Sequence, residues 1–225
     1  MHAGGYMGRE IDLLANYPRT ARDINGRMKE KTDEDRRIAR RFDKDFFDGD
    51  RRYGYGGYNY NARFWQPVVP ILKEYYKLTA GSRVLDVGCG KGFMLYDLMQ
   101  LIPGIIVAGV DISDYAIANA KEEVRPFLQV GNAKELPFEN KSFDLIISIT
   151  TIHNLAMEDC KTALHEMERV SGKDKFITVD AYRNEEEKKN MAMWNLTALT
   201  YMSTNEWKKF FEETGYIGDY YWFIP

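Results

Sequence analysis

Short apolar runs alternate with helical patterns of apolar residues along the chain from residue 83 onward. Strands buried on both faces of a parallel sheet are apolar throughout, whereas a covering helix repeats its apolar residues about every three to four positions. The alternation predicts a doubly wound, mostly parallel α/β sheet with flanking helices. The predicted strands are residues 83–87, 105–110, 127–130, 143–149 and 176–179. The predicted helices between them are residues 93–102, 113–124 and 157–170.

The two ends of the chain follow other patterns. Residues 1–62 combine dense charge with a Gly/Tyr-rich segment, and they predict an extension with a helix at 33–42. The main domain is then expected at residues 63–225, beginning with a helix at 67–78. Near the other end we expect a charged helix, a helix closed by Gly215 and an aromatic strand. These three elements are residues 184–190, 205–214 and 219–224.

Composition narrows the class of protein. A chain of 225 residues, 44% of them apolar, can bury one sizeable core. Its apolar runs fall short of the ~20 residues of a membrane span and no leader pattern is seen, so a cytoplasmic protein without membrane contact is expected. The net charge of −3 favours a small-molecule substrate over nucleic acid. Cys89 and Cys160 have no CxxC or His-pair context, so neither a disulfide nor a metal site is expected.

A glycine-rich turn, Asp86-Val87-Gly88-Cys89-Gly90-Lys91-Gly92, joins the first predicted strand to a helix. Glycines there let the backbone approach a ligand closely, and the helix start offers unpaired N–H groups. A dinucleotide-binding turn needs a small residue where Phe93 stands, and the Walker pattern is absent. What remains is an acid two residues before G-x-G-x-G.

With its flanking strand and helix, this turn resembles the first motif of class I, Rossmann-like methyltransferases that use S-adenosylmethionine (SAM). The resemblance implies that SAM is the cofactor and that Asp86 lies near its amino-acid end. It also implies that the backbone of the turn wraps the cofactor, through Gly88, Cys89, Gly90 and Gly92. Within the class, residues 142–155 are most similar to quinone-biosynthesis methyltransferases, which carry Leu-His-His where this chain has Ile152-His153-Asn154.

Two later segments complete the expected cofactor site. Asp111 ends the second strand, where a carboxylate can accept both ribose hydroxyls, and Ser113 is expected to cap the next helix. Asn132 stands where the family most often has an acid near the adenine, and its amide offers both a donor and an acceptor. The remaining predicted cofactor contacts are Ile112, Ala133 and Ile149.

The chemistry is expected at the carboxyl ends of the strands, where His153 and Asp180 follow the fourth and fifth strands. His153 is the candidate general base, because its ordinary pKa is near neutral; alternatively it only orients a loop or packs beside the cofactor. Asp180 is a second catalytic candidate that could bind a substrate hydroxyl or amine or share proton removal, unless it merely pairs with Arg183. Asn154 and Tyr182 are predicted substrate contacts.

The Gly/Tyr-rich segment is predicted to be a lid with glycine hinges, whose tyrosines contact the substrate. These tyrosines are Tyr53, Tyr55, Tyr58 and Tyr60. The segment could instead stack on nucleobases or pack on itself as a surface loop. The favoured function is methylation of a hydroxyl or amine on a small polar metabolite, such as a sugar or sugar-nucleotide intermediate. The alternatives are an RNA or protein methyltransferase, or a catalytically silent SAM-binding partner subunit.

The resemblance also implies seven strands, the last two as an antiparallel pair at one edge of the sheet. Here only residues 220–224 are clearly strand-like after the fifth strand, and the seventh strand is either residues 194–202 or missing. Six or seven strands are therefore expected. Because a bare aromatic edge would invite pairing with other chains, we expect the N-terminal extension or a second subunit, in a homodimer, to cover it.

Overall fold

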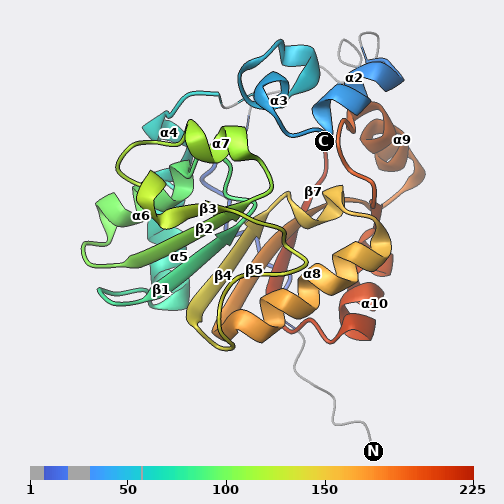
Figure 1. The fold of residues 1–225 in the computed structure, drawn as a ribbon. Coiled ribbons are helices and arrows are strands. Elements are labelled where there is room, and N and C mark those ends of the chain that lie inside the picture. The colour runs from blue at the N-terminus through green and yellow to red at the C-terminus, as the bar shows by residue number, and fades with distance from the viewer. Residues whose placement is uncertain (1–7, 20–30, 57) are drawn as a thin grey trace, which may run out of the picture.

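The computed structural model describes residues 8–19, 31–56 and 58–225. They build a seven-stranded sheet in the order β3-β2-β1-β4-β5-β6, with β7 also paired to β5 (Figure 1). The strands are β1 (Arg83–Val87), β2 (Ile106–Asp111), β3 (Leu128–Val130), β4 (Phe143–Ile149), β5 (Ser171–Tyr182), β6 (Met202–Ser203) and β7 (Asp219–Phe223). The predicted doubly wound α/β fold is confirmed.

Helices cover both faces of the sheet (Figure 1). On one face, α5 (Val69–Tyr76) and α6 (Phe93–Leu101) pack in a core with Val84 of β1. On the other face, α8 (Met157–Val170) and α10 (Thr204–Thr214) pack in a core with the neighbouring Leu85. Successive strand residues point to opposite faces, so a strand covered on both sides must be apolar at almost every position. This is why β1 and β4 have the bounds that the apolar pattern predicts, and α8 matches its prediction because its buried residues recur at helical spacing.

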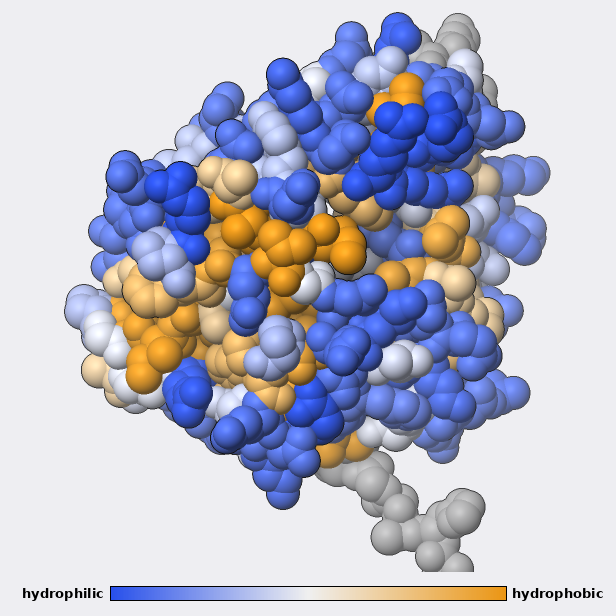
Figure 2. All heavy atoms as spheres, in the orientation of Figure 1, coloured by the Kyte–Doolittle hydropathy of each residue, from blue (hydrophilic) through white to orange (hydrophobic). Residues whose placement is uncertain are grey.

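The remaining helices lie in the N-terminal extension, at the carboxyl edge of the sheet and, for η2, directly before β3. They are α2 (Asp33–Ala39), α3 (Lys44–Asp48), η1 (Arg51–Tyr53), α4 (Ala62–Trp65), α7 (Asp114–Ala118), η2 (Arg125–Phe127), η3 (Ile152–Asn154) and α9 (Glu185–Trp194). In Figure 2 the surface over α2 and α3 is hydrophilic, whereas apolar side chains gather over β2 and β3. Among the described helices, none has the length and apolar character needed to cross a membrane.

The two largest differences in length between the predicted and observed elements are in α7 and β5. Helix α7 ends at Ala118 and not at residue 124, because the side chain of Asn119 donates to the carbonyl of Tyr115 at 2.8 Å and stops the helix. Its start is as expected, with the Ser113 hydroxyl accepting from the Ala116 N–H at 3.0 Å. Strand β5 begins at Ser171, ahead of its apolar run, because its polar first residues still pair with β4 across a bulge.

The last two strands correct the expected antiparallel pair. Both β6 and β7 run parallel to β5, with Ala181 opposite Met202 and Phe176 opposite Asp219. Helix α10 lies between them in sequence and provides the crossover that a parallel connection requires. Of residues 194–202, only Met202 enters a strand.

The N-terminal extension covers the outer edge of β7. This is one of the two arrangements that we expected from the sequence, the other being a second subunit. The Ile11 N–H donates to the carbonyl of Tyr220 at 3.0 Å, and the Tyr220 N–H donates to the carbonyl of Arg9 at 3.0 Å. An ion pair of 2.7 Å between Glu10 and Lys208 ties the same segment to α10. The aromatic strand is therefore paired on both sides within one chain.

Candidate functional site

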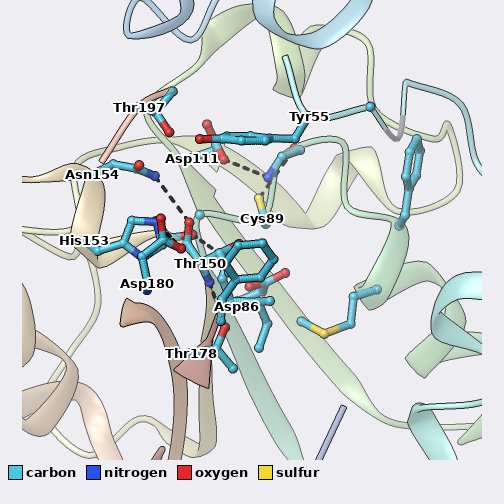
Figure 3. A pocket seen from close by; sticks show the side chains of 18 of the residues that line it. Tyr55, Asp86, Cys89, Asp111, Thr150, His153, Asn154, Thr178, Asp180 and Thr197 are labelled. Carbon is cyan, nitrogen blue, oxygen red and sulfur yellow. Dashed lines mark hydrogen bonds and ion pairs between the residues drawn. The ribbon is translucent and has the colours of Figure 1, made fainter. Parts of the chain in front are cut away.

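A cavity of about 1340 Å³ opens at the carboxyl ends of the strands. Most of the residues singled out from the sequence line it: Tyr55, Asp86, Gly88, Cys89, Gly90, Asp111, Ile112, Asn132, Ala133, Ile149, His153, Asn154 and Asp180. Gly92, Tyr53, Tyr58, Tyr60 and Tyr182 are not among its lining residues. Segments far apart in the sequence thus meet around one space (Figure 3).

The glycine turn has the left-handed backbone that its residue type permits. Gly88, Gly90 and Gly92 have φ values of 85°, 54° and 72°. A Cβ atom at Gly88 would lie 2.2 Å from Oγ1 of Thr151, which no side chain could tolerate. At Gly92 a Cβ atom would lie 2.8 Å from side chains of Leu128 and Val124, so this glycine serves close packing of the helix and not the cavity wall.

Asp111 holds the turn from the next strand. Its carboxylate accepts the Gly90 N–H at 2.7 Å and the Ser113 N–H at 2.9 Å. Burial raises its pKa, although these two backbone bonds oppose that shift. Each oxygen keeps one further acceptor position, because a carboxylate offers about four in total.

Asp86 lies deeper and is almost fully buried. Its carboxylate has no hydrogen-bond partner or ion pair among the described residues. Burial, with a smaller contribution from the nearby Asp111, raises the pKa of Asp86 to about 8. A buried acid without a partner is costly to ionise, so this position favours a cationic ligand group.

Asn132 and its neighbours form the far wall beyond β3. The Asn132 side-chain oxygen accepts the Lys134 N–H at 3.0 Å, which fixes the amide plane. Its amide nitrogen has no partner within residues 8–19, 31–56 and 58–225. Ile112 is 57% exposed although apolar, and it faces the cavity together with Ala133. This wall offers an apolar surface beside one amide donor.

The loop after β4 contains a strained residue that sequence reasoning missed. Thr150 has a φ of 50°, which is rare for a β-branched side chain. Its N–H donates to both the carbonyl and the hydroxyl of Thr178, at 3.0 Å each, and these bonds maintain the conformation. Strain of this kind is concentrated at functional sites.

His153 and Asp180 form a buried pair on the same side of the cavity (Figure 3). The Asp180 N–H donates to Nδ1 of His153 at 3.0 Å, and Nε2 of the ring lies 3.5 Å from Oδ1 of Asp180. Since Nδ1 accepts, the neutral ring carries its proton on Nε2, facing the carboxylate. Burial lowers the pKa of His153 to about 3. Arg183, the other partner considered for Asp180, bonds instead to Glu187 at 2.8 Å.

Asn154 follows the pair and adds a polar group to the cavity wall. Its side-chain nitrogen donates to the carbonyl of Thr150 at 3.3 Å. Its side-chain oxygen is buried and has no hydrogen-bond partner in the part of the chain that the structure describes. An unpartnered buried acceptor requires a donor, and a bound ligand could provide it.

Only one of the four candidate tyrosines reaches the cavity. Tyr55 faces it beside Thr197, and its hydroxyl accepts the Leu196 N–H at 2.8 Å (Figure 3). Its ring stacks on Trp194 with centroids 6.0 Å apart. Tyr60 instead donates to Asp97 of α6 at 2.6 Å, and its role is to anchor the segment. The predicted lid includes residue 57, which lies outside the described residues.

Lys91 inside the glycine turn binds the N-terminal extension, which the sequence pattern did not indicate. Its ammonium donates to Asp48 at 2.5 Å and to the carbonyl of Tyr58 at 2.8 Å. The other oxygen of Asp48 accepts the hydroxyl of Tyr115 at 2.7 Å. The extension is thus fastened directly over the turn. The described part of the chain holds no cluster of His, Cys, Asp or Glu suited to a metal ion.

Comparison with known proteins agrees with this architecture. Residues 78–215 match a family model described as a methyltransferase domain. The chain is 31% identical over 144 residues to tRNA (carboxymethyluridine(34)-5-O)-methyltransferase from Arabidopsis thaliana, covering 64% of this chain and 33% of that relative. It is 37% identical over 84 residues to demethylmenaquinone methyltransferase from Symbiobacterium thermophilum, covering 34% of each. It therefore spans only about a third of the length of each of these relatives.

A solved structure has the same fold. It is a Haemonchus contortus phosphoethanolamine N-methyltransferase 2, in complex with phosphomonomethylethanolamine and S-adenosylhomocysteine. It aligns with a TM-score of 0.53 and 23% identity, over 68% of this chain and 37% of that one.

Proposed function

The chain belongs to the methyltransferase domain family, and from this premise we propose that it transfers a methyl group from SAM to a hydroxyl or amine of a small polar molecule. The observation that carries the proposal is the continuity of one cavity from the glycine turn to Asp180. Its volume of about 1340 Å³ exceeds the ~300–1000 Å³ of a typical pocket for one ligand. It has room for a cofactor and a small acceptor side by side.

The residues at the strand ends fit SAM. The buried carboxylate of Asp86 suits the positively charged amino-acid end, and Gly88 and Gly90 leave the backbone free to approach it. The remaining acceptor positions of Asp111 suit the two ribose hydroxyls. Ile112 and Ala133 offer apolar contact to the adenine, and the free amide N–H groups of Asn132 can donate to a ring nitrogen. Ile149 and Cys89 complete the wall.

Because of the raised pKa of Asp86, this assignment predicts that the affinity for SAM depends on pH. Its pKa of about 8 means that the carboxyl is largely neutral below that pH and ionised above it. A cation binds the ionised form better, so the affinity for SAM should rise between about pH 6.5 and 8.5. Calorimetry at several pH values measures this, and Asp86→Asn should remove the dependence. An affinity that is flat with pH in the wild type would contradict it.

Asp180 and His153 have different roles in removing the proton of the acceptor. SAM supplies a methyl group already activated by its sulfonium, and this chain must align the acceptor and take its proton. His153 cannot accept that proton at Nδ1, which is occupied by the Asp180 N–H. We therefore assign proton removal to the Asp180 carboxylate and a positioning role to His153. The proton passes from the acceptor hydroxyl or amine to Asp180 while the methyl group leaves sulfur for that oxygen or nitrogen.

The N-terminal extension supplies a cover for this site, with residues 1–62 ahead of a catalytic domain at 63–225. The bonds from Lys91 to Asp48 and Tyr58 support a closed position over the glycine turn. Of the predicted lid residues, Tyr55 is the one placed to contact an acceptor. Opening of the extension would admit the cofactor, and closure would exclude water.

RNA is a second candidate acceptor, favoured by the 31% identity to a plant tRNA methyltransferase. An experiment with labelled SAM distinguishes the two candidate acceptors. The protein is incubated with labelled SAM and a metabolite extract in one reaction, and with labelled SAM and total tRNA in another. Label in a small-molecule fraction that requires the protein supports the proposal. Label confined to tRNA would replace it with the second candidate, and binding of S-adenosylhomocysteine without labelling of either pool would favour a silent subunit.

A further inference from the structure

The balance of charge differs between the inner wall of the cavity and its mouth. The carboxylates of Asp86, Asp111 and Asp180 lie buried at the strand ends. The mouth is lined by arginines of the N-terminal extension, of which Arg40 and Arg51 are exposed. Figure 2 shows the corresponding hydrophilic surface over α2 and α3. The inner wall is therefore acidic, while the extension lines the mouth with more basic than acidic residues, the acidic ones being Glu10, Asp12 and Asp50.

Two of the arginines at this mouth are paired with acidic residues. Arg19 pairs with Asp12, and Arg52 lies 3.7 Å from Asp50. Arg40, by contrast, has no ion pair within residues 8–19, 31–56 and 58–225. Its charge is available to a ligand that enters the mouth.

Arg40 is held in a defined orientation. It follows α2 directly, and its Nε donates to the carbonyl of Thr197 at 3.3 Å. The loop that contains Thr197 also packs on the catalytic pair, since the Thr200 N–H donates to the carbonyl of His153 at 3.0 Å. The two Nη groups have no hydrogen-bond partner in the described chain, and together they present parallel N–H donors suited to a carboxylate or phosphate.

A second contact also joins the N-terminal extension to another segment that lines the cavity. Lys31, just before α2, donates to the carbonyl of Trp194 at 2.7 Å and lies 5.6 Å from the centre of the Tyr55 ring. Together with the bond from Arg40 to Thr197, this joins the N-terminal extension to the end of α9 and the loop after it. Contacts that hold two cavity-lining segments together favour a small acceptor over a polynucleotide.

We propose that the acceptor molecule carries an anionic group, a phosphate or a carboxylate, which Arg40 binds at the mouth while the reacting hydroxyl or amine lies at Asp180. The inference rests on the proposed methyltransferase function. The buried carboxylates favour a hydrogen-bond donor on the acceptor molecule, and the side-chain oxygen of Asn154 can accept a further bond from that donor. The arginine at the mouth favours the anionic group. Arg40 is then a specificity-determining residue.

The test titrates inorganic phosphate and, separately, propionate into protein saturated with S-adenosylhomocysteine. We expect millimolar binding of at least one anion by the wild type and at least a tenfold loss in Arg40→Gln. Arg37→Gln is the matched control, because Arg37 lies in α2 just ahead of Arg40, pairs with Glu34 at 2.5 Å and does not line the cavity. Ethanolamine phosphate should likewise bind at least tenfold more tightly than ethanolamine, and Arg40→Gln should remove that preference.

Each other outcome is decisive. Absence of anion binding in the wild type, or equal binding by Arg40→Gln, overturns the inference. Loss of tRNA binding in Arg40→Gln, with a steep salt dependence and no effect on phosphate compounds, would overturn its small-molecule form. Binding of S-adenosylhomocysteine is measured first in every variant. If the wild type does not bind S-adenosylhomocysteine, the proposed function is contradicted. If it binds S-adenosylhomocysteine normally, the result of the anion titration bears only on the anion site.

Discussion

Asp180→Asn is expected to lower the methyl transfer rate by about 10²–10⁴-fold, the range typical of a lost general base, with little change in cofactor affinity. The amide keeps the size of the side chain and can still accept from Nε2 of His153, but it cannot take a proton. Raising the pH should restore part of the lost rate, because a hydroxide ion can then remove the acceptor's proton. Single-turnover rates with labelled SAM measure the effect.

Comparison with His153→Asn separates the two roles. If His153 only positions the carboxylate, its variant should lose roughly tenfold and retain the pH profile of the wild type, a smaller loss than in Asp180→Asn. The reverse order of the two losses would show that His153 is the base. Glu213→Gln is the control, because it removes an ion pair with Lys209 on α10, and neither residue lines the cavity. Thermal unfolding of each variant checks that the fold is retained.

Asp111→Asn is expected to weaken cofactor binding by about 10–100-fold, or roughly 1.4–2.8 kcal/mol. The amide has one acceptor oxygen where the carboxylate has two, and it cannot serve Gly90, Ser113 and both ribose hydroxyls together. Hydrogen bonds to a charged group are worth about 1.5–3 kcal/mol, which sets the scale. Calorimetry with S-adenosylhomocysteine gives the dissociation constant directly.

The matched control is Asp114→Asn, which changes the same residue type three positions further along, at the start of α7 and outside the cavity lining. It should leave the affinity within about twofold, while weakening the first turn of α7 slightly. Equal affinities for wild type and Asp111→Asn would remove the ribose assignment. A loss of similar size in both variants would indicate that the effect comes through α7 and not through the ligand.

The central strands and the cofactor turn could be predicted because the information lies within short stretches of sequence. A strand such as β1, buried on both faces, must be apolar, and the glycine turn is contiguous. The direction of β7 could not be predicted in the same way. Aromatic residues favour a strand of either direction, and the parallel arrangement depends on the crossover through α10.

The substrate side was harder to predict for a similar reason. Tyr55 and Tyr60 occur in one repetitive segment, and nothing in the spacing distinguishes the one that faces the cavity. The difference arises from Asp97, a buried acid of α6 that accepts the hydroxyl of Tyr60. The orientation of His153 likewise depends on the backbone N–H of Asp180, which belongs to another strand. Contacts of this kind have no local pattern.

The pairing of residues 9–11 with β7 has a consequence for biosynthesis. The bond between Arg9 and Asp219 spans 210 residues, so this contact cannot form until residue 219 has left the ribosome. Closing so long a loop is entropically unfavourable, and such distant contacts are slow to form. We therefore expect the inner strands to assemble during translation and the outer edge of β7 to pair with residues 9–11 in a late step. Before that step the aromatic strand has an unpaired edge, to which chaperones can bind.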